Sequence, residues 1–192
     1  HHFIATARNN ACKNFEDYFH SDTSQNCFYN PDMFLETPAL IEKYAGKVES
    51  HKVTTDDGYI LTMFRIPRTK PKAFYLWHAG YDIWLSNARG TLFSEGHKKL
   101  KISSFQYWDF SFHEIGIYDI SSQIKLIRSK INNSKISFIG HSMGTTTGLI
   151  YSSMHSLEAK NSINAFALLA IPVYFKYATS AIKYFVPYER IL

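Results

Sequence analysis

The sequence predicts an α/β fold, in which helices flank a mostly parallel sheet and an antiparallel hairpin lies near the N-terminus. Short apolar segments alternate with segments of helical periodicity over the second half of the chain. This strand, helix, strand order is typical of a parallel sheet with helices on its faces. Nearer the N-terminus, Asp57 and Gly58 separate two segments in which apolar and polar residues alternate. An Asp-Gly pair in that position is the strongest short-range sign of a hairpin.

Length and composition indicate one folded core. The chain has 192 residues, 45% of them hydrophobic and 19% charged, which excludes disorder over most of its length. Residues 1–35 are polar and lack a sustained period, so we expect an N-terminal extension there, followed by one partial domain in residues 36–192. The longest nearly apolar run, residues 163–175, is shorter than the ~18 residues of a spanning helix, so no transmembrane segment is expected.

The first half of the chain contains segments that suit one helix and four strands. In chain order these are a helix at residues 38–44, the hairpin strands at 51–55 and 59–66, and two buried strands at 73–78 and 81–85. Pro67 and Pro71 make the stretch between the hairpin and the buried strands a connector.

The second half is predicted to run helix, strand, helix, strand. Isoleucines recur at spacings of 3, 4, 3 and 4 on one face of the first helix: Ile117, Ile120, Ile124, Ile127 and Ile131. That face should pack on the sheet. A strand at residues 136–139, a helix from 143 to about 156 and a strand at 165–171 follow.

The net charge of +5 comes from 21 basic and 16 acidic residues that are scattered along the chain. Segments 65–72, 98–101 and 125–135 contain several basic residues each but form no single stripe, so no nucleic-acid partner is expected. Weak peripheral contact with a lipid surface stays open.

Cys12 and Cys27 are the two cysteines, and no zinc-ligand spacing accompanies them, so no metal is expected. The residues alone leave two free thiols and a disulfide equally open. A bridge would close a loop of 27 − 12 = 15 residues, worth about 3 kcal/mol in the chain-entropy treatment. Asn132, followed by Asn133 and Ser134, is a glycosylation acceptor in an expected surface loop. The chain starts at His1 without a signal-peptide pattern, which suggests a mature or partial product.

A possible nucleophile lies between the strand at 136–139 and the helix that follows it. The five residues there match the G-x-S-x-G pattern of a nucleophile elbow: Gly140, His141, Ser142, Met143 and Gly144. A strained turn would present Ser142 Oγ to solvent, and both glycines would avoid a Cβ collision with the neighbouring backbone. The Met143 N–H, at the helix N-terminus, would be an oxyanion donor. The alternative is a plain tight turn.

Five motifs, in order, resemble the gastric and lysosomal group of acid lipases, which are α/β-hydrolases. They are Asn30-Pro31-Asp32 and the segments 53–67, 80–90, 107–119 and 138–146. The resemblance implies a secreted or lysosomal hydrolase of triacylglycerols or other fatty acyl esters, acting in lipid catabolism without metal or organic cofactor. It places the nucleophile on Ser142.

The chain departs from that group in its acid and base, which in α/β-hydrolases follow the nucleophile. The residues after Ser142 include one histidine, His155, and two acids, Glu158 and Glu189. His155 lies thirteen positions along the predicted helix, about 20 Å from Ser142 at 1.5 Å per residue, whereas a general base must come within about 3 Å. We therefore expect an incomplete α/β-hydrolase that is nearly inactive by itself. Ester turnover that vanishes in Ser142→Ala would contradict this.

A second departure follows His78, where the family has an oxyanion loop and a crossover helix. Here Ala79 and Gly80 alone join two predicted strands, and two residues span at most about 7 Å, too short for a parallel crossover. The sequence thus suggests an internal deletion, with His78 as a remnant of the oxyanion loop.

Other polar residues are expected to be structural. His113 and Glu114 suit a helix start, and Asp82, Asn87 and Arg89 suit loop anchoring by hydrogen bonds and ion pairs. Two alternatives to the esterase hypothesis stay open. One is a catalytically silent lipase-like protein that binds lipid or a partner through an exposed sheet edge. The other is a partial gene product that does not fold stably.

Overall fold

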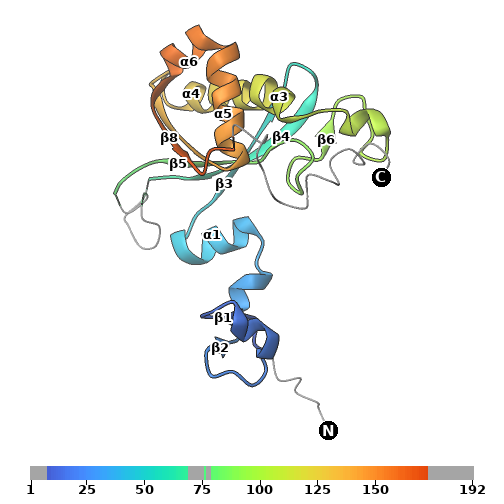
Figure 1. Ribbon diagram of the computed structural model, residues 1–192. Helices are drawn as coiled ribbons and strands as arrows, with labels where there is room; N and C mark the ends of the chain where they lie inside the picture. The colour runs from blue at the N-terminus through green and yellow to red at the C-terminus, as the bar shows by residue number, and fades with distance from the viewer. Residues whose placement is uncertain (1–7, 69–75, 77–78, 173–192) are drawn as a thin grey trace. The chain divides into compact units, whose positions relative to one another are not determined.

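The computed structural model describes residues 8–68, 76 and 79–172, and Figure 1 traces the chain. Internal contacts divide the chain into two compact units. One comprises His1–Glu49 and Phe64–Ile83, and the other comprises Ser50–Met63 and Trp84–Leu192. The division expected between residues 35 and 36 stays a prediction. Within the described residues, no helix is long and apolar enough to cross a membrane.

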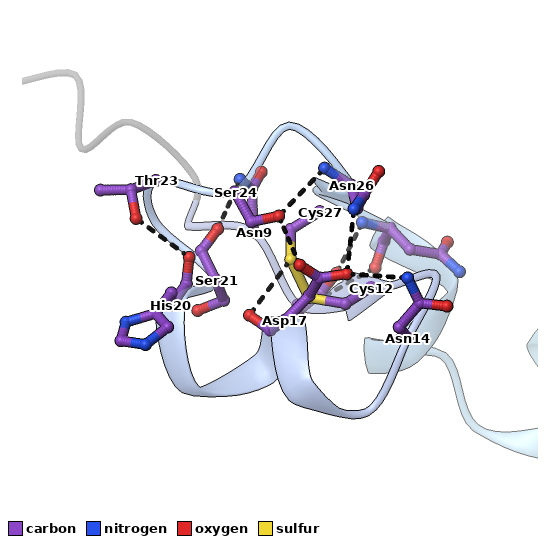
Figure 2. Close-up of a disulfide and its surroundings, with 12 residues drawn as sticks. Asn9, Cys12, Asn14, Asp17, His20, Ser21, Thr23, Ser24, Asn26 and Cys27 are labelled. Atoms are coloured by element: carbon purple, nitrogen blue, oxygen red, sulfur yellow. Dashed lines mark hydrogen bonds between the residues drawn. A yellow bond between two sulfur atoms is a disulfide. The ribbon is translucent and has the colours of Figure 1, made fainter.

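The N-terminal part of the first unit is closed by a disulfide. Strand β1 (Ala11–Cys12) pairs antiparallel with β2 (Cys27–Phe28), with the short 3-10 helix η1 (Glu16–His20) between them. Cys12 and Cys27 are bonded to each other (Figure 2), which settles the question that the sequence left open.

Asp17 organises the disulfide-closed loop. Its carboxylate accepts hydrogen bonds from Ser24 Oγ at 2.8 Å, Asn26 Nδ2 at 3.1 Å and Asn14 Nδ2 at 3.2 Å (Figure 2). The bond from Ser24 contributes most to holding the pKa of Asp17 below its usual value. Cys27 is the one buried residue among residues 8–29, and the largest aromatic side chains there are exposed. The loop is therefore held by its disulfide and by polar contacts, and not by an apolar core.

We predict that the Cys12→Ser/Cys27→Ser variant loses the order of residues 8–29 while the second unit keeps its own. A loop of 15 residues gains about 3 kcal/mol from its cross-link, and this segment has no core to compensate for the loss. Amide hydrogen exchange, read separately over residues 8–29 and 136–169, measures both effects. Unchanged protection in residues 8–29 would mean that the Asp17 hydrogen bonds are sufficient.

Helix α1 (Thr37–Ala45) confirms the expected helix at 38–44. It follows the 3-10 helix η2 (Pro31–Phe34), in which Asn30 Oδ1 accepts a hydrogen bond from the Asp32 N–H at 3.0 Å. The Asp32 carboxylate in turn binds Lys43 and Tyr44 of α1. The helix ends at Gly46, whose φ of 82° is in the left-handed region that favours glycine. The first unit also contains the ion pairs from Arg65 to Asp82 and to Glu49.

The predicted hairpin is confirmed. Strands β3 (Glu49–Thr54) and β4 (Tyr59–Ile66) are joined by a tight turn in which the Thr55 N–H donates to Tyr59 O at 2.8 Å. Gly58 has a φ of 104°, which only glycine adopts readily. The sheet has the order β3-β4-β5, and β6 (Gly96–His97) pairs antiparallel with β4. Strand β5 (Ile83–Ser86) begins two residues later than expected. The strand predicted at 73–78 lies outside the described residues, apart from Leu76.

The isoleucine-rich helix starts earlier than its periodicity indicated. It comprises α3 (Phe112–Glu114), the π-helical segment η4 (Ile115–Ile120) and α4 (Ser121–Lys130). A capping box begins it, since Ser111 Oγ accepts from the His113 N–H and the Glu114 carboxylate accepts from the Ser111 N–H. His113 and Glu114 therefore lie at a helix start, as predicted. Ile120, Ile124 and Ile127 are buried and Ile117 is half-buried, whereas Ile131, also half-buried, follows the last residue of α4 and so lies outside the predicted helix face.

The C-terminal part of the second unit has the predicted parallel pair of strands. Strand β7 (Ile136–His141) runs parallel to β8 (Ile163–Leu169), with α5 (Met143–Met154) and α6 (Ser156–Ser162) between them in the chain. The helix α6 was not predicted. A cluster of buried side chains joins α4, α5, α6 and β8: Ile120, Ile124, Tyr151, Ala159 and Ile163. The parallel arrangement is thus present in this pair, whereas β6 pairs antiparallel with β4.

A second cluster lies beneath the hairpin. Tyr59, Leu61 and Tyr107 are buried together, and Tyr107 belongs to the 3-10 helix η3 (Phe105–Trp108). The Tyr59 hydroxyl donates to the Tyr107 carbonyl oxygen. Beside them, His97 Nε2 donates to Asp57 O at 3.1 Å, while its Nδ1 accepts from the Lys99 and Leu100 N–H groups at 2.9 Å each. These bonds tie the hairpin turn to the loop that follows β6.

Arg89 joins three segments of the second unit. Its Nε donates to Asp119 Oδ1 at 2.8 Å, and its Nη1 donates to Asp57 Oδ2 at 2.6 Å. The backbone N–H of Arg89 also donates to Asp119, at 2.8 Å. Both Arg89 and Asp119 are fully buried, with side-chain exposures of 1% and 0%. Burial would lower the pKa of Arg89, but the hydrogen bonds to Asp57 and Asp119 raise it above its ordinary value, so the guanidinium stays charged.

We predict that Arg89→Met destabilises the second unit by about 3 to 5 kcal/mol, because it leaves the Asp119 carboxylate buried without a counter-charge. Lys125→Met is the matched control. It removes an exposed pair with Glu158 at 3.6 Å and should cost no more than about 1 kcal/mol. Urea unfolding followed by tryptophan fluorescence compares the two. Equal midpoints for the two variants would contradict the role given to Arg89.

Candidate active site

Ser142 occupies a sharp bend between a strand and a helix, as predicted. Strand β7 ends at His141 and α5 begins at Met143, so that Ser142 alone joins them. Its backbone has φ 51° and ψ −119°, a conformation that side-chain-bearing residues rarely adopt. The Ser142 N–H donates to Leu169 O of β8 at 3.0 Å, and Ser142 O accepts from the Thr145 N–H at 2.9 Å. The side chain of Ser142 is exposed.

The two glycines of the motif have different roles. A Cβ on Gly140 would lie 2.7 Å from Gly144 O and 2.9 Å from Thr145 N, which the backbone cannot accommodate. A Cβ on Gly144 would meet nothing within 4 Å. The expectation that both glycines prevent a collision is therefore wrong for Gly144, because the described backbone leaves space on that side of α5.

Thr145 and Gly148 also hold the bend, and neither was predicted as a site residue. Thr145 is fully buried, and its Oγ1 lies 3.0 Å from both Gly140 O and Leu169 O. A Cβ on Gly148 would lie 2.6 Å from the Phe138 ring, so the glycine lets α5 lie close against β7. Both roles could have been predicted from the sequence, since Thr145 falls in the first turn of the expected helix and Gly148 about one turn later.

The predicted oxyanion donor, the Met143 N–H, lies at a helix N-terminus. Met143 is the first residue of α5, and the first N–H groups of a helix have no acceptor within it. The helix dipole adds partial positive charge at the same end. Met143 is 46% exposed, so its side chain lies at the surface.

The histidine and the acid that follow Ser142 are engaged elsewhere. His155 ends α5, twelve helical residues or about 18 Å from the bend, and its Nε2 donates to Ile117 O at 3.1 Å. Glu158 accepts from Ser121 Oγ and from the Tyr151 hydroxyl, each at 3.1 Å. Burial raises the pKa of Tyr151, which keeps this donor protonated. Over the described ranges, no histidine is hydrogen-bonded to Ser142, and Glu189 lies outside them.

Of the other predicted site residues, His141 is adjacent to Ser142, Asn132 is remote from it, and His78 is not described. His78 lies outside the described residues, as does most of the predicted strand before it. His141 is exposed at the end of β7, and Asn132 is exposed in the turn between α4 and β7. An open depression of about 470 Å³ lies at the far end of α5, lined by residues from Met154 to Asn161, and does not include Ser142. No group of three potential metal ligands is found in the described parts of the chain.

The sequence matches two known protein families. Residues 66–188 match the family model of the alpha/beta hydrolase fold, and residues 37–89 match that of a partial alpha/beta-hydrolase lipase region. The chain belongs to the α/β-hydrolase family. The predicted α/β-hydrolase fold is thereby confirmed, and so is the resemblance to acid lipases, because the similar proteins include gastric lipases.

Three relatives show how much of the family is shared. Lipase member K of Mus musculus is 34% identical over 191 residues, which cover 83% of this chain and 48% of the relative. Gastric triacylglycerol lipase of Bos taurus is 31% identical over 201 residues, covering 85% and 50%. Lipase 1 of Drosophila melanogaster is 35% identical over 163 residues, covering 72% and 37%. The chain thus spans about half the length of these relatives or less.

We predict that Gly140→Ala disrupts the bend, whereas Gly144→Ala does not. The alanine Cβ at position 140 would collide with backbone atoms 2.7 to 2.9 Å away, while at position 144 it enters open space and favours the helix by up to about 1 kcal/mol. Chemical denaturation should show a large loss of stability for Gly140→Ala and none for Gly144→Ala. The geometry described here is wrong if position 140 tolerates alanine as well as position 144 does.

Proposed function

We propose that this chain supplies the nucleophile of a serine hydrolase that cleaves fatty acyl esters, triacylglycerols among them. The observation that carries the proposal is the exposed Ser142 held at a positive φ between β7 and α5, in a chain that belongs to the α/β-hydrolase family. Relatives named as triacylglycerol lipases support the choice of substrate class. Neither metal nor organic cofactor enters this chemistry.

In the proposed mechanism Ser142 Oγ attacks the ester carbonyl carbon and forms a tetrahedral intermediate. The Met143 N–H donates to the oxyanion, with the N-terminus of α5 adding favourable partial charge. Collapse of the intermediate releases the alcohol and leaves an acyl group on Ser142, which water then removes. Gly140, His141 and Gly144 flank the nucleophile in the elbow, and the close backbone approach at Gly140 keeps its shape.

Ser142 also requires a general base within about 3 Å and, for full activity, a second oxyanion donor. In similar hydrolases the loss of one such donor costs about 2.7 to 4 kcal/mol. The sequence lacks the family's oxyanion loop after His78, which would supply the second donor, and His78 itself lies outside the described residues. The base and its acid belong to residues other than His155 and Glu158, whose side chains are bonded elsewhere.

Exposed apolar side chains near the bend support contact with a lipid substrate. Ile139 of β7, Met143 of α5 and Leu169 of β8 are each about half exposed, and all three lie within three residues of Ser142 or of its hydrogen-bond partner. The Cys12–Cys27 disulfide supports an oxidising compartment, so we propose a secreted or lysosomal location. Peripheral contact with a lipid surface is part of the same proposal.

The test is ester hydrolysis by the full gene product that carries these residues. With an emulsified long-chain triacylglycerol, Ser142→Ala should reduce kcat by about 10⁴-fold or more, since the nucleophile acts as a unit with its base. Ser137→Ala, on an exposed position of the same strand, is the matched control and should retain activity. Retention of activity in Ser142→Ala would show that another residue is the nucleophile.

A catalytically silent lipase-like protein is the second candidate, favoured by the engagement of His155 and Glu158 in structural hydrogen bonds. This candidate predicts no turnover by the wild type or by Ser142→Ala. It also predicts that both proteins bind triacylglycerol emulsion droplets equally well in a flotation assay. Turnover by the wild type would exclude it.

A further inference from the structure

We propose that Asn132 carries an N-linked oligosaccharide. The sequence contains one Asn-x-Ser/Thr triplet in which x is not proline, and it is Asn132-Asn133-Ser134. A triplet of this kind occurs often by chance, so the proposal rests on three further observations: the exposure of the triplet, the hydrogen bonds of its turn, and the disulfide elsewhere in the chain.

The triplet forms an exposed turn between α4 and β7. Asn132, Asn133 and Ser134 are all exposed. Asn132 and Asn133 have φ angles of 52° and 58°, so two successive residues adopt the left-handed conformation that asparagine tolerates better than most side chains. A bulky, hydrophilic modification is tolerated in such a surface turn, where nothing packs over the acceptor.

The turn is held by its backbone and by Arg128, which leaves the Asn132 amide free for another role. The Asn133 N–H donates to Arg128 O at 2.8 Å, and the Ser134 N–H donates to Ile131 O at 3.1 Å. Arg128 Nη2 donates to Asn133 O at 2.8 Å. Within the described residues, the Asn132 side chain takes part in none of these bonds, so the fold loses no contact when its Nδ2 is substituted.

The disulfide is independent support for the compartment. Cys12 and Cys27 form their bond in the first unit, far along the chain from Asn132, and structural disulfides persist in secretory and extracellular compartments. Proteins that acquire such bonds in the secretory pathway also meet the machinery that glycosylates Asn-x-Ser/Thr triplets. Both features therefore point to the same route through the cell.

The transfer itself is a substitution at the first sugar of a lipid-pyrophosphate-linked oligosaccharide. Asn132 Nδ2 forms a bond to C1 of that sugar, and the bond from C1 to the pyrophosphate oxygen breaks. The amide nitrogen loses one proton, and the lipid pyrophosphate leaves with the electron pair of the broken bond. No oxidant or reductant is required.

The oligosaccharide would lie at the opposite end of β7 from Ser142. Asn132 precedes the first residue of the strand, Ile136, whereas Ser142 follows its last residue, His141. A strand of 6 residues is about 20 Å long at 3.3 Å per residue. The modification should therefore leave the chemistry of the bend unaffected.

The experiment is expression of the full chain in a eukaryotic secretory host, followed by peptide N-glycosidase treatment and mass spectrometry. We expect a mobility shift on treatment and conversion of Asn132 to Asp in the released peptide. The shift should be absent in Asn132→Gln and in Ser134→Ala. It should be retained in Asn133→Gln, which changes the neighbouring exposed asparagine and keeps the acceptor triplet.

Two results would overturn the proposal. One is a secreted wild-type chain whose Cys12–Cys27 peptide is bridged but whose Asn132 is unmodified, since the bridge proves passage through the oxidising compartment. The other is a shift that persists in Asn132→Gln. Because Asn133→Gln perturbs the same turn, its normal secretion and modification would show that loss of the shift in Asn132→Gln is not a folding defect.

Discussion

The second unit depends on one buried cation. Arg89 lies in the segment after β5, and its guanidinium binds Asp57 in the hairpin turn and Asp119 in the π-helical segment, so three segments far apart in the sequence meet at one group. Its central carbon lies 3.9 Å from the centroid of the Tyr59 ring, over the apolar cluster beneath the hairpin. Burial raises the pKa of Asp119 against the opposing effect of Arg89, because desolvation disfavours the buried carboxylate. The pair therefore contributes mainly by fixing which segments meet.

A series of close packing contacts connects the helix that carries Asp119 to the bend at Ser142. The helix that carries Asp119 packs against α5 so closely that a Cβ on Gly116 would lie 2.6 Å from Ile150 Cγ2. Helix α5 is in turn pressed onto β7 through Gly148 and Phe138. Ser142 is at the N-terminal end of this stack, where the strained φ is maintained by hydrogen bonds to Leu169 O and from the Thr145 N–H. Ser142 thus lies at one end of a series of packed elements that extends back through the helix carrying Asp119 to Arg89.

The sequence predicted the features that depend on local residues and missed those that depend on distant ones. The Asp57-Gly58 turn and the Gly140–Gly144 bend were predictable because both require a glycine. Gly58 adopts a positive φ, and at Gly140 the backbone leaves no space for a Cβ. The π-helical segment, helix α6 and the partners of Arg89 were not, because they are selected by packing and by pairing with residues 30 or more positions away. The Cys12–Cys27 pairing stayed open for a similar reason, since the polar contacts around Asp17 that fold the loop have no periodic pattern.

The bend is also separable from catalysis. Among the described residues, the hydrogen bonds that hold the Ser142 backbone and the adjacent turn come from β7, β8 and the first turn of α5, and none of them involves a histidine side chain. A strained residue of this kind survives only where its surroundings over-determine it, and here the surroundings are complete without the rest of an active site. Stability and ester turnover should therefore respond to different residues. Gly140 and Thr145 maintain the shape of the bend, whereas in the proposed function the hydroxyl of Ser142 takes part only in the chemistry, and Asn132 at the far end of β7 takes part in neither.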